Sequence, residues 1–148
     1  GFEKGSKGVK RKKVIKIITE SNAFQHLKVY NEAKKYFNLL SKKFDVHVVS
    51  HVDLKWKKKR KNNLKGFQYK SINCNKIHKE VLIEQVVEKY APKSKKKDII
   101  VIEDGPLNIP KLVKEGYSVF HPAWHGYCKD LEGQAFKNWK NLYNMINK

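Results

Sequence analysis

Residues 98–122 decide the fold, and they read DIIVIEDGPLNIPKLVKEGYSVFHP. The stretch opens with the apolar run IIVI, which is typical of a strand buried on both faces of a parallel sheet. Glu103 and Asp104 follow at the carboxyl end of that strand, the edge at which open α/β sheets bind ligands. A helical segment over 108–114 and a second apolar run over 117–120 complete a strand–helix–strand unit.

Glu103 and Asp104 have two interpretations from the sequence alone. They could bind a ligand at the sheet edge, or they could simply cap the helix that follows. Loop statistics favour neither interpretation, so both stay open at this point.

Short apolar runs alternate with helical patterns along the rest of the chain. This alternation predicts an α/β fold of the three-layer, Rossmann-like type, with a mostly parallel sheet and helices on both faces. We expect a single domain over 14–148, preceded by a flexible basic arm over 1–13. The expected strands lie at 14–19, 46–50, 69–74, 99–102 and 117–120, and the expected helices at 27–43, 76–90, 108–114 and 134–147.

The charge is the dominant feature of the composition. Thirty-three lysines and arginines face 14 acidic residues, which gives a formal net charge of +19. Such a positive field favours polyanions through counterion release, and it also suits acidic protein partners. No apolar run approaches the ~18 residues that a membrane-spanning helix needs, so we expect no membrane partner.

Three basic stretches are predicted to contact nucleic-acid phosphates, although a solvated surface is the simpler interpretation of each. Trp56 lies inside the second stretch, where it could stack on bases or pack in the core. We favour the core, because tryptophan is usually well buried. The predicted nucleic-acid-binding residues are Lys7, Lys10, Arg11, Lys12, Lys13, Lys55, Lys57, Lys58, Lys59, Arg60, Lys61, Lys95, Lys96 and Lys97.

The two cysteines, Cys74 and Cys128, are too few for a disulfide framework and indicate reduced thiols in an intracellular protein. His121, His125 and Cys128 have a spacing that could bind zinc, with Cys74 as a fourth ligand. A proline and a glycine break this segment into a loop, however, and no CxxC pair is present. We therefore expect the segment to line or close a cleft instead.

The order and spacing of these segments resemble the haloacid dehalogenase (HAD) superfamily of phosphatases, and within it the 5'(3')-deoxyribonucleotidase-like branch. VHVVS, which ends at Ser50, resembles the motif whose hydroxyl holds the transferring phosphoryl group. Lys79 or Lys76 fits the lysine that opens the helix before the acidic strand. IIVIEDGPLN resembles the motif whose acidic residues hold Mg²⁺, with Asp104 the better match and Glu103 beside it. GYSVFHPAWHGY and AFKNWKNLYNMI resemble the ending of that branch.

The chain departs from this family at the end of the first strand. The resemblance implies an Asp-x-Asp motif there, whose first aspartate forms an aspartyl-phosphate, but the sequence reads VIKIITESNAF and has no aspartate before Asp45. Thr19, Glu20 and Ser21 occupy the place. Losing the nucleophile removes the covalent route, and losing its carboxylate should weaken a Mg²⁺ site. The cap segment is also nearly absent.

Two hypotheses for the function follow. The first is a catalytically inactive HAD-like domain, without a cofactor, that serves as a basic structural or RNA-binding component of a ribonucleoprotein such as a mitochondrial ribosome. Its partners would be RNA backbone and neighbouring proteins, in the mitochondrial matrix or the cytoplasm. The alternative is a Mg-dependent nucleotidase-like phosphatase for nucleotides or nucleic-acid ends, with its nucleophile supplied from elsewhere. A weaker third interpretation is a protein-interaction module that uses the aromatic loop over 117–127.

Overall fold

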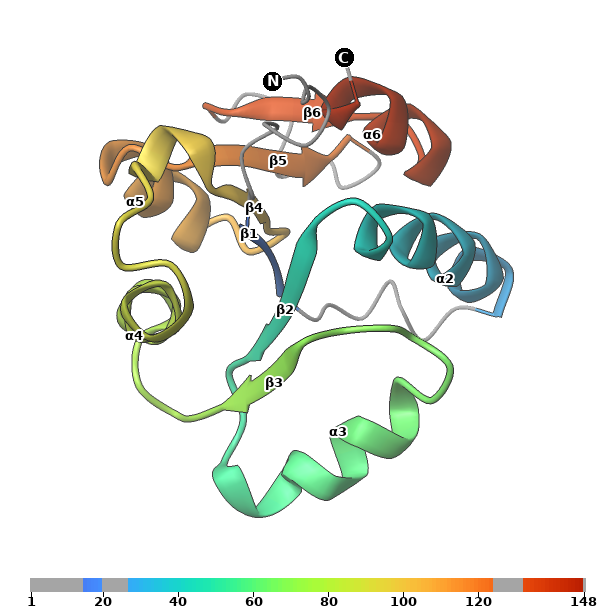
Figure 1. The fold of residues 1–148 in the computed structure, drawn as a ribbon, viewed down its shortest axis with the longest axis horizontal. Helices are drawn as coiled ribbons and strands as arrows, with labels where there is room; N and C mark the ends of the chain where they lie inside the picture. Colours follow the sequence, from blue (N-terminus) through green and yellow to red (C-terminus); the bar gives the residue numbers. More distant parts are fainter. Residues whose placement is uncertain (1–14, 20–26, 124–131, 148) are drawn as a thin grey trace, which may run out of the picture.

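The computed structural model describes residues 15–19, 27–123 and 132–147, with side chains from residue 31 onward. Six parallel strands form one sheet in the order β3-β2-β1-β4-β5-β6 (Figure 1). None of the described helices is both long and apolar enough to cross a membrane. The strands are β1 (Ile15–Thr19), β2 (Asp45–Ser50), β3 (Ser71–Cys74), β4 (Ile100–Ile102), β5 (Ser118–Pro122) and β6 (Gln134–Phe136). The helices are α2 (Leu27–Ser41), α3 (Lys57–Asn63), α4 (Lys79–Tyr90), α5 (Asn108–Lys114) and α6 (Trp139–Ile146), with 3₁₀ turns η2 (Leu54–Trp56) and η3 (Lys96–Asp98).

The predicted three-layer α/β fold is confirmed. Helices α4 and α5 lie on one side of the sheet and α2 and α6 on the other (Figure 1). Each side has its own apolar cluster: Ile83 and Leu112 belong to the first, and Phe37 and Leu142 to the second. The chain builds β1, β2 and β3 outward to one edge and then returns to β4 beside β1. The strand order therefore reverses between β1 and β4, where folds of this type place their ligand site.

The end of the chain differs from the expected helix over 134–147. Residues Gln134–Phe136 form a strand that pairs in parallel with β5, and α6 starts only at Trp139. Phe136 lies on the same three- to four-residue spacing as Trp139 and Leu142, so the apolar pattern resembles one continuous helix. Asn138 separates the two elements, because its backbone is extended and its side chain accepts a hydrogen bond from the Asn141 amide at 2.8 Å.

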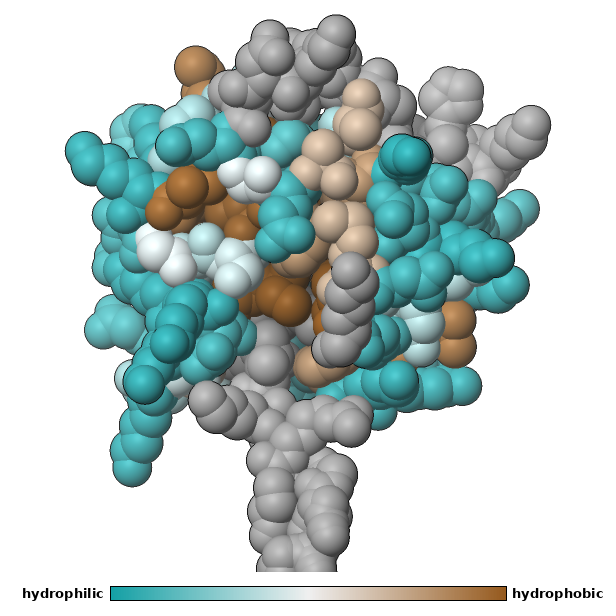
Figure 2. Space-filling model, turned by 90° about the horizontal axis from the view of Figure 1, so that it is seen from above, coloured by the Kyte–Doolittle hydropathy of each residue, from teal (hydrophilic) through white to brown (hydrophobic). Residues whose placement is uncertain are grey.

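The face seen from the side of β6 has both apolar and hydrophilic side chains (Figure 2). Hydrophilic side chains surround a narrower apolar strip on this face (Figure 2). Phe136 is 0% exposed, and its ring centre lies 5.5 Å from that of Trp139. The short strand β6 and the helix α6 therefore close the sheet edge by burying their aromatic residues inward.

The position of Trp56 also differs from the prediction. It is 48% exposed, so the prediction that it packs in the core is wrong. Leu64 and Phe67, 4% and 6% exposed, come after α3 and supply the apolar contacts of this crossover instead. Tryptophan is usually buried, but here Leu64 and Phe67 cover the sheet in its place.

His47 on β2 should make the stability of the fold depend on pH. Its side chain is 2% exposed, with Nδ1 2.6 Å from the Ser71 hydroxyl and the ring 4.5 Å from that of Tyr90. Burial lowers the pKa of His47 below its ordinary value of 6.5, against an opposing effect of Asp45. The unfolded chain therefore binds the proton more readily, so the free energy of unfolding should fall as the pH drops below about 6.5 and level off below the folded-state pKa.

Urea unfolding measured at several pH values between about 8 and about 5 checks this prediction. His47→Gln, which keeps a hydrogen-bonding group toward Ser71, should flatten the pH dependence in this window. An identical slope in wild type and His47→Gln would rule out His47 as its source.

Candidate phosphate-binding site

Three predicted site residues lie at the carboxyl edge of the sheet. Ser50 is the last residue of β2, Glu103 follows β4, and Lys79 is the first residue of α4. Ser50 and Glu103 are buried, at 3% and 1% exposure. Because β1 lies between β2 and β4, these residues flank the end of β1 at the point where the strand order reverses. The site thus occupies the usual ligand position of an open α/β sheet.

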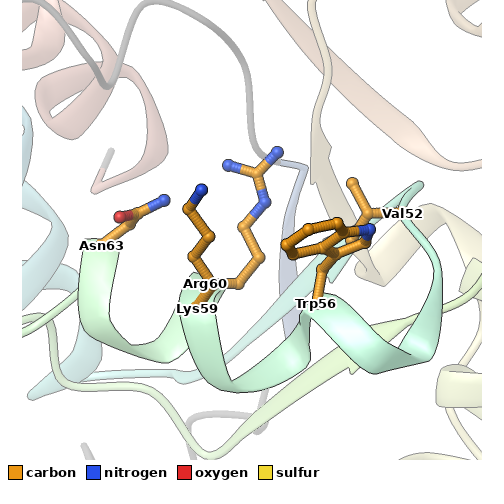
Figure 3. A pocket seen from close by; sticks show the side chains of 5 residues that line it. All are labelled: Val52, Trp56, Lys59, Arg60 and Asn63. Carbon is orange, nitrogen blue, oxygen red and sulfur yellow. The ribbon is translucent and has the colours of Figure 1, made fainter.

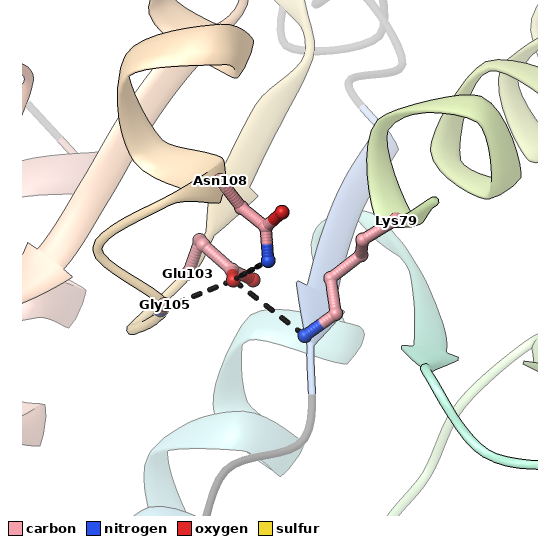
Figure 4. A network of polar contacts seen from close by, with 4 residues as sticks. All are labelled: Lys79, Glu103, Gly105 and Asn108. Atoms are coloured by element: carbon pink, nitrogen blue, oxygen red, sulfur yellow. Dashed lines mark hydrogen bonds and ion pairs between the residues drawn. The ribbon is translucent and has the colours of Figure 1, made fainter. Parts of the chain in front are cut away.

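The Glu103 carboxylate is the centre of a polar network (Figure 4). Its Oε2 lies 3.5 Å from the Lys79 ammonium, and it accepts hydrogen bonds from the Asn108 side chain at 3.0 Å and the Gly105 amide at 3.1 Å. The Glu103 side chain is 0% exposed and that of Lys79 is 11% exposed. Within the described part of the chain, one ammonium therefore compensates a fully buried carboxylate, and two neutral donors fix its orientation.

Gly105 is required by this network. A Cβ atom at position 105 would lie 2.6 Å from Glu103 Oε2 and 3.0 Å from Asn108 Nδ2. Any larger residue would displace the carboxylate from its donors. Gly105 and Asn108 were not among the predicted site residues, although both belong to the same EDGPLN segment as Glu103.

The structure also distinguishes between the two interpretations of Glu103, ligand binding at the sheet edge and helix capping. Leu107 is the N-cap of α5, and its side chain makes no capping hydrogen bond. Glu103 instead bridges to Lys79 at the start of a different helix, so it joins two elements across the sheet edge. Helix capping is therefore not the role of Glu103.

Comparison with known proteins identifies the architecture. No family model matches the chain, and no curated protein matches it. The core domain of a candidate phosphoglycolate phosphatase from Streptococcus pneumoniae superposes with a TM-score of 0.67 at 9% identity, covering 93% of this chain and 97% of that chain. The cobalt-bound deoxy-D-mannose-octulosonate 8-phosphate phosphatase from Haemophilus influenzae gives 0.64 at 15% identity, covering 90% and 86%. The fold is HAD-like.

A third solved structure extends the likeness beyond phosphatases. The L-2-haloacid dehalogenase RSc1362 superposes with a TM-score of 0.59 at 9% identity, and the match covers 78% of this chain but 54% of the dehalogenase. The architecture is therefore common to proteins with different named activities. The chemistry of this HAD-like chain has to come from its own residues.

Of the two lysines that fit the HAD motif, the structure brings Lys79 to the acidic strand. Lys76 lies before α4 on the exposed surface, where its backbone carbonyl accepts a hydrogen bond from His51 Nε2 at 2.8 Å. Asp104, the better sequence match of the acidic pair, is half-buried, whereas Glu103 is the residue that pairs with Lys79. Burial and pairing thus point to Lys79 and Glu103 as the centre of the site.

The HAD resemblance implies a Mg²⁺ ion beside the acidic residues that follow β4. Glu103 Oε1 is buried and has no hydrogen-bond partner among the described residues, which leaves one carboxylate oxygen available there for a cation or a donor. The described part of the chain contains no group of three or more histidine, cysteine, aspartate or glutamate residues that could hold a metal ion. Mg²⁺ requires near-octahedral oxygen coordination, so these residues do not fit a Mg²⁺ site by themselves.

Two of the four predicted zinc ligands lie outside the described residues. His121 and Cys74 are buried, at 1% and 5% exposure, and Cys74 belongs to an apolar cluster. His125 and Cys128 lie in the segment 124–131, which is not described. The zinc ligand set therefore stays an untested prediction.

The two basic stretches that the structure describes lie apart from one another. Residues 7–13 are outside the described chain. Lys55 to Lys61 follow the carboxyl end of β2, whereas Lys95 to Lys97 precede the amino end of β4 and so lie toward the opposite edge of the parallel sheet. Lys96 is also engaged by Glu115, with 2.8 Å between ammonium and carboxylate, and that carboxylate raises the pKa of Lys96. The group at 55–61 is therefore the one nearer the site.

Proposed function

We propose that this HAD-like domain binds a phosphate ester at the carboxyl edge of its sheet and does not hydrolyse it through an aspartyl-phosphate. The observation that carries the proposal is the Lys79 ammonium, held by the buried Glu103 carboxylate at the edge where β2 ends in Ser50. An ammonium has three donors, so the contact with Glu103 leaves donors for phosphoryl oxygens. The positive end of the 12-residue helix α4 adds to the attraction for an anion.

The end of β1 supports binding without covalent catalysis. Thr19 is the last residue of β1 and pairs with Val49, one residue before Ser50. This is the place of the aspartyl nucleophile in the HAD family, and the chain continues there with Glu20 and Ser21. Without a nucleophile at that position, the two-step covalent reaction has no first step.

The alternative is a Mg-dependent nucleotidase-like phosphatase that acts on nucleotides or nucleic-acid ends. The fold shared with solved phosphatases supports it, and Ser50, Lys79 and Asp104 would then hold the substrate and Mg²⁺. Against it stand the missing aspartates of the first strand and the incomplete set of metal ligands among the described residues. Both hypotheses predict phosphate binding, and they differ in turnover.

Calorimetric titration with a nucleoside monophosphate, paired with a phosphate-release assay, tests the proposal. We expect binding that Ser50→Ala weakens by about 10- to 100-fold, because a hydrogen bond to a charged group is lost. Ser118→Ala is the matched control, because Ser118 donates to the Lys97 carbonyl at the start of β5 and should not affect binding. Mg-dependent phosphate release that Ser50→Ala abolishes would contradict the proposal and establish the phosphatase.

A second candidate function rests on the surface charge. The net charge of +19 and the lysines of residues 7–13, 55–61 and 93–97 favour a basic RNA-binding component of a ribonucleoprotein, such as a mitochondrial ribosome. The specific observation in its favour is that η2 and α3 bury none of their residues and present their cations to solvent. Phosphate contacts of this kind position a protein on RNA without reading bases.

A further inference from the structure

The segment from Leu54 to Asn63 lacks the apolar stripe by which a crossover helix normally packs on its sheet. Neither η2 nor α3 contains a buried residue. The contacts with the second apolar cluster come from Leu64 and Phe67, after the helix has ended. Core packing therefore does not explain the composition of this segment.

The charge of the segment opposes its own helical structure. Residues 57–61 read KKKRK, and Asp53 is the one acidic residue within 53–65. Asp53 is used as a cap, since its carboxylate accepts a hydrogen bond from the Lys55 amide at 3.1 Å. Like charges three and four residues apart destabilise a helix, so a polyanion along α3 would relieve the repulsion.

Trp56 begins a face on which aromatic and cationic side chains stand together. Trp56, Lys59, Arg60 and Asn63 point to the same side and, with Val52, line a hollow of about 340 Å³ (Figure 3). The ammonium groups of Lys55 and Lys59 lie 5.7 and 5.4 Å from the centre of the Trp56 ring. The hollow thus offers an exposed indole with cations at its margin.

The hollow adjoins the candidate phosphate-binding site. Val52 lies two residues beyond Ser50, and its amide donates to the Ser50 carbonyl at 3.0 Å. A ligand in the hollow is therefore at the carboxyl edge of the sheet. The other side of the same helix forms a second hollow lined by Leu54, Lys55, Lys57, Lys58 and Lys61.

We propose that the face formed by Val52, Trp56, Lys59, Arg60 and Asn63 binds single-stranded nucleic acid, with a base stacked on Trp56 and flanking phosphates paired with Lys59 and Arg60. The inference rests on the second candidate function and adds the kind of nucleic acid and its mode of binding. Cations alone would suit any polyanion, duplexes and acidic proteins included. An exposed indole among cations selects an unpaired base, because a base in a duplex has both faces stacked.

The test compares the full chain and its variants for binding to a labelled single-stranded RNA of about 12 nucleotides and to its duplex. Trp56→Ala should weaken single-strand binding by about 5- to 100-fold, with little effect on duplex binding. Trp56→Phe should retain most of the affinity, since a ring remains for stacking. Lys58→Ala, on the other side of α3, is the matched control for a lost charge, and Lys59→Ala should cost more than Lys58→Ala.

Each outcome decides between binding modes. Salt-dependent RNA binding that is unchanged by Trp56→Ala, or reduced equally for strand and duplex, would overturn stacking and leave the second candidate function standing. Absence of salt-dependent binding to any RNA would overturn both. Equal affinity for polyglutamate would overturn the inference in favour of an acidic protein partner. Because Trp56 is 48% exposed, Trp56→Ala should melt like the wild type, which thermal unfolding verifies.

Discussion

Replacing Lys79 with methionine should destabilise the fold by about 3 kcal/mol and lower its midpoint of thermal unfolding by about 10 °C. The Glu103 side chain is 0% exposed and Lys79 supplies its compensating charge, so the variant would keep a buried carboxylate without a counter-ion. Asn108 and Gly105 would still donate to it, but neutral donors do not replace a charge. Guanidinium unfolding monitored by circular dichroism measures the loss.

The structure provides a matched control in Lys96→Met. Lys96 and Glu115 form a shorter ion pair, at 2.8 Å, but their side chains are 39% and 49% exposed, so the loss of this pair should destabilise the fold clearly less than Lys79→Met does. Adding Glu103→Gln to Lys79→Met should restore most of the stability, because the unpaired charge is then gone. Equal, small losses in Lys79→Met and Lys96→Met would mean that Glu103 is not held by Lys79.

Replacing Phe136 with alanine should cost about 3–5 kcal/mol, as truncation of a fully buried aromatic side chain usually does. Phe136 is 0% exposed and packs beside Trp139 in the cluster that also contains Phe37 and Phe120. The cavity would open between β6 and α6, at the edge of the sheet. Equilibrium denaturant unfolding measures the change in the free energy of unfolding.

Leu107→Ala is the control for this truncation. Leu107 is 80% exposed, so removing its side chain should change the stability by no more than about 0.5 kcal/mol. A comparably small effect of Phe136→Ala would contradict the position of β6 at the sheet edge.

Most of the fold can be predicted from the sequence because parallel strands leave strong local signals. The clearest is the run over 99–102, which is uninterrupted because both faces of β4 are covered. The expected helix at 108–114 matches α5, Asn108–Lys114, because Gly105, Pro106 and Gly116 delimit it; Gly116 has a positive φ of 101° that favours glycine. The strand β6 could not be found, because three residues that pair only through the backbone carry no period of their own.

The site is less predictable because it depends on which side chains meet across the sheet. The sequence could not choose between Lys76 and Lys79, since the choice depends on where α4 begins. The preference for Asp104 over Glu103 as a Mg²⁺ ligand stays a prediction, because neighbouring positions differ in sequence only by the direction of their side chains. The prediction for Trp56 failed because it also depended on which side chains reach the sheet. Leu64 and Phe67 pack against the sheet instead of Trp56, and no local sequence pattern indicates this.

An amide NMR titration with a nucleoside monophosphate tests the phosphate site most directly. We predict that the largest shift changes occur at residues around Ser50, at the first turn of α4 next to Lys79, and at Glu103 to Gly105. Weaker shift changes at α3 would reflect the attraction of the anionic nucleotide to the positive charge of that helix. Changes confined to α3, or spread evenly over the exposed lysines, would contradict a phosphate-binding site at the carboxyl edge of the sheet.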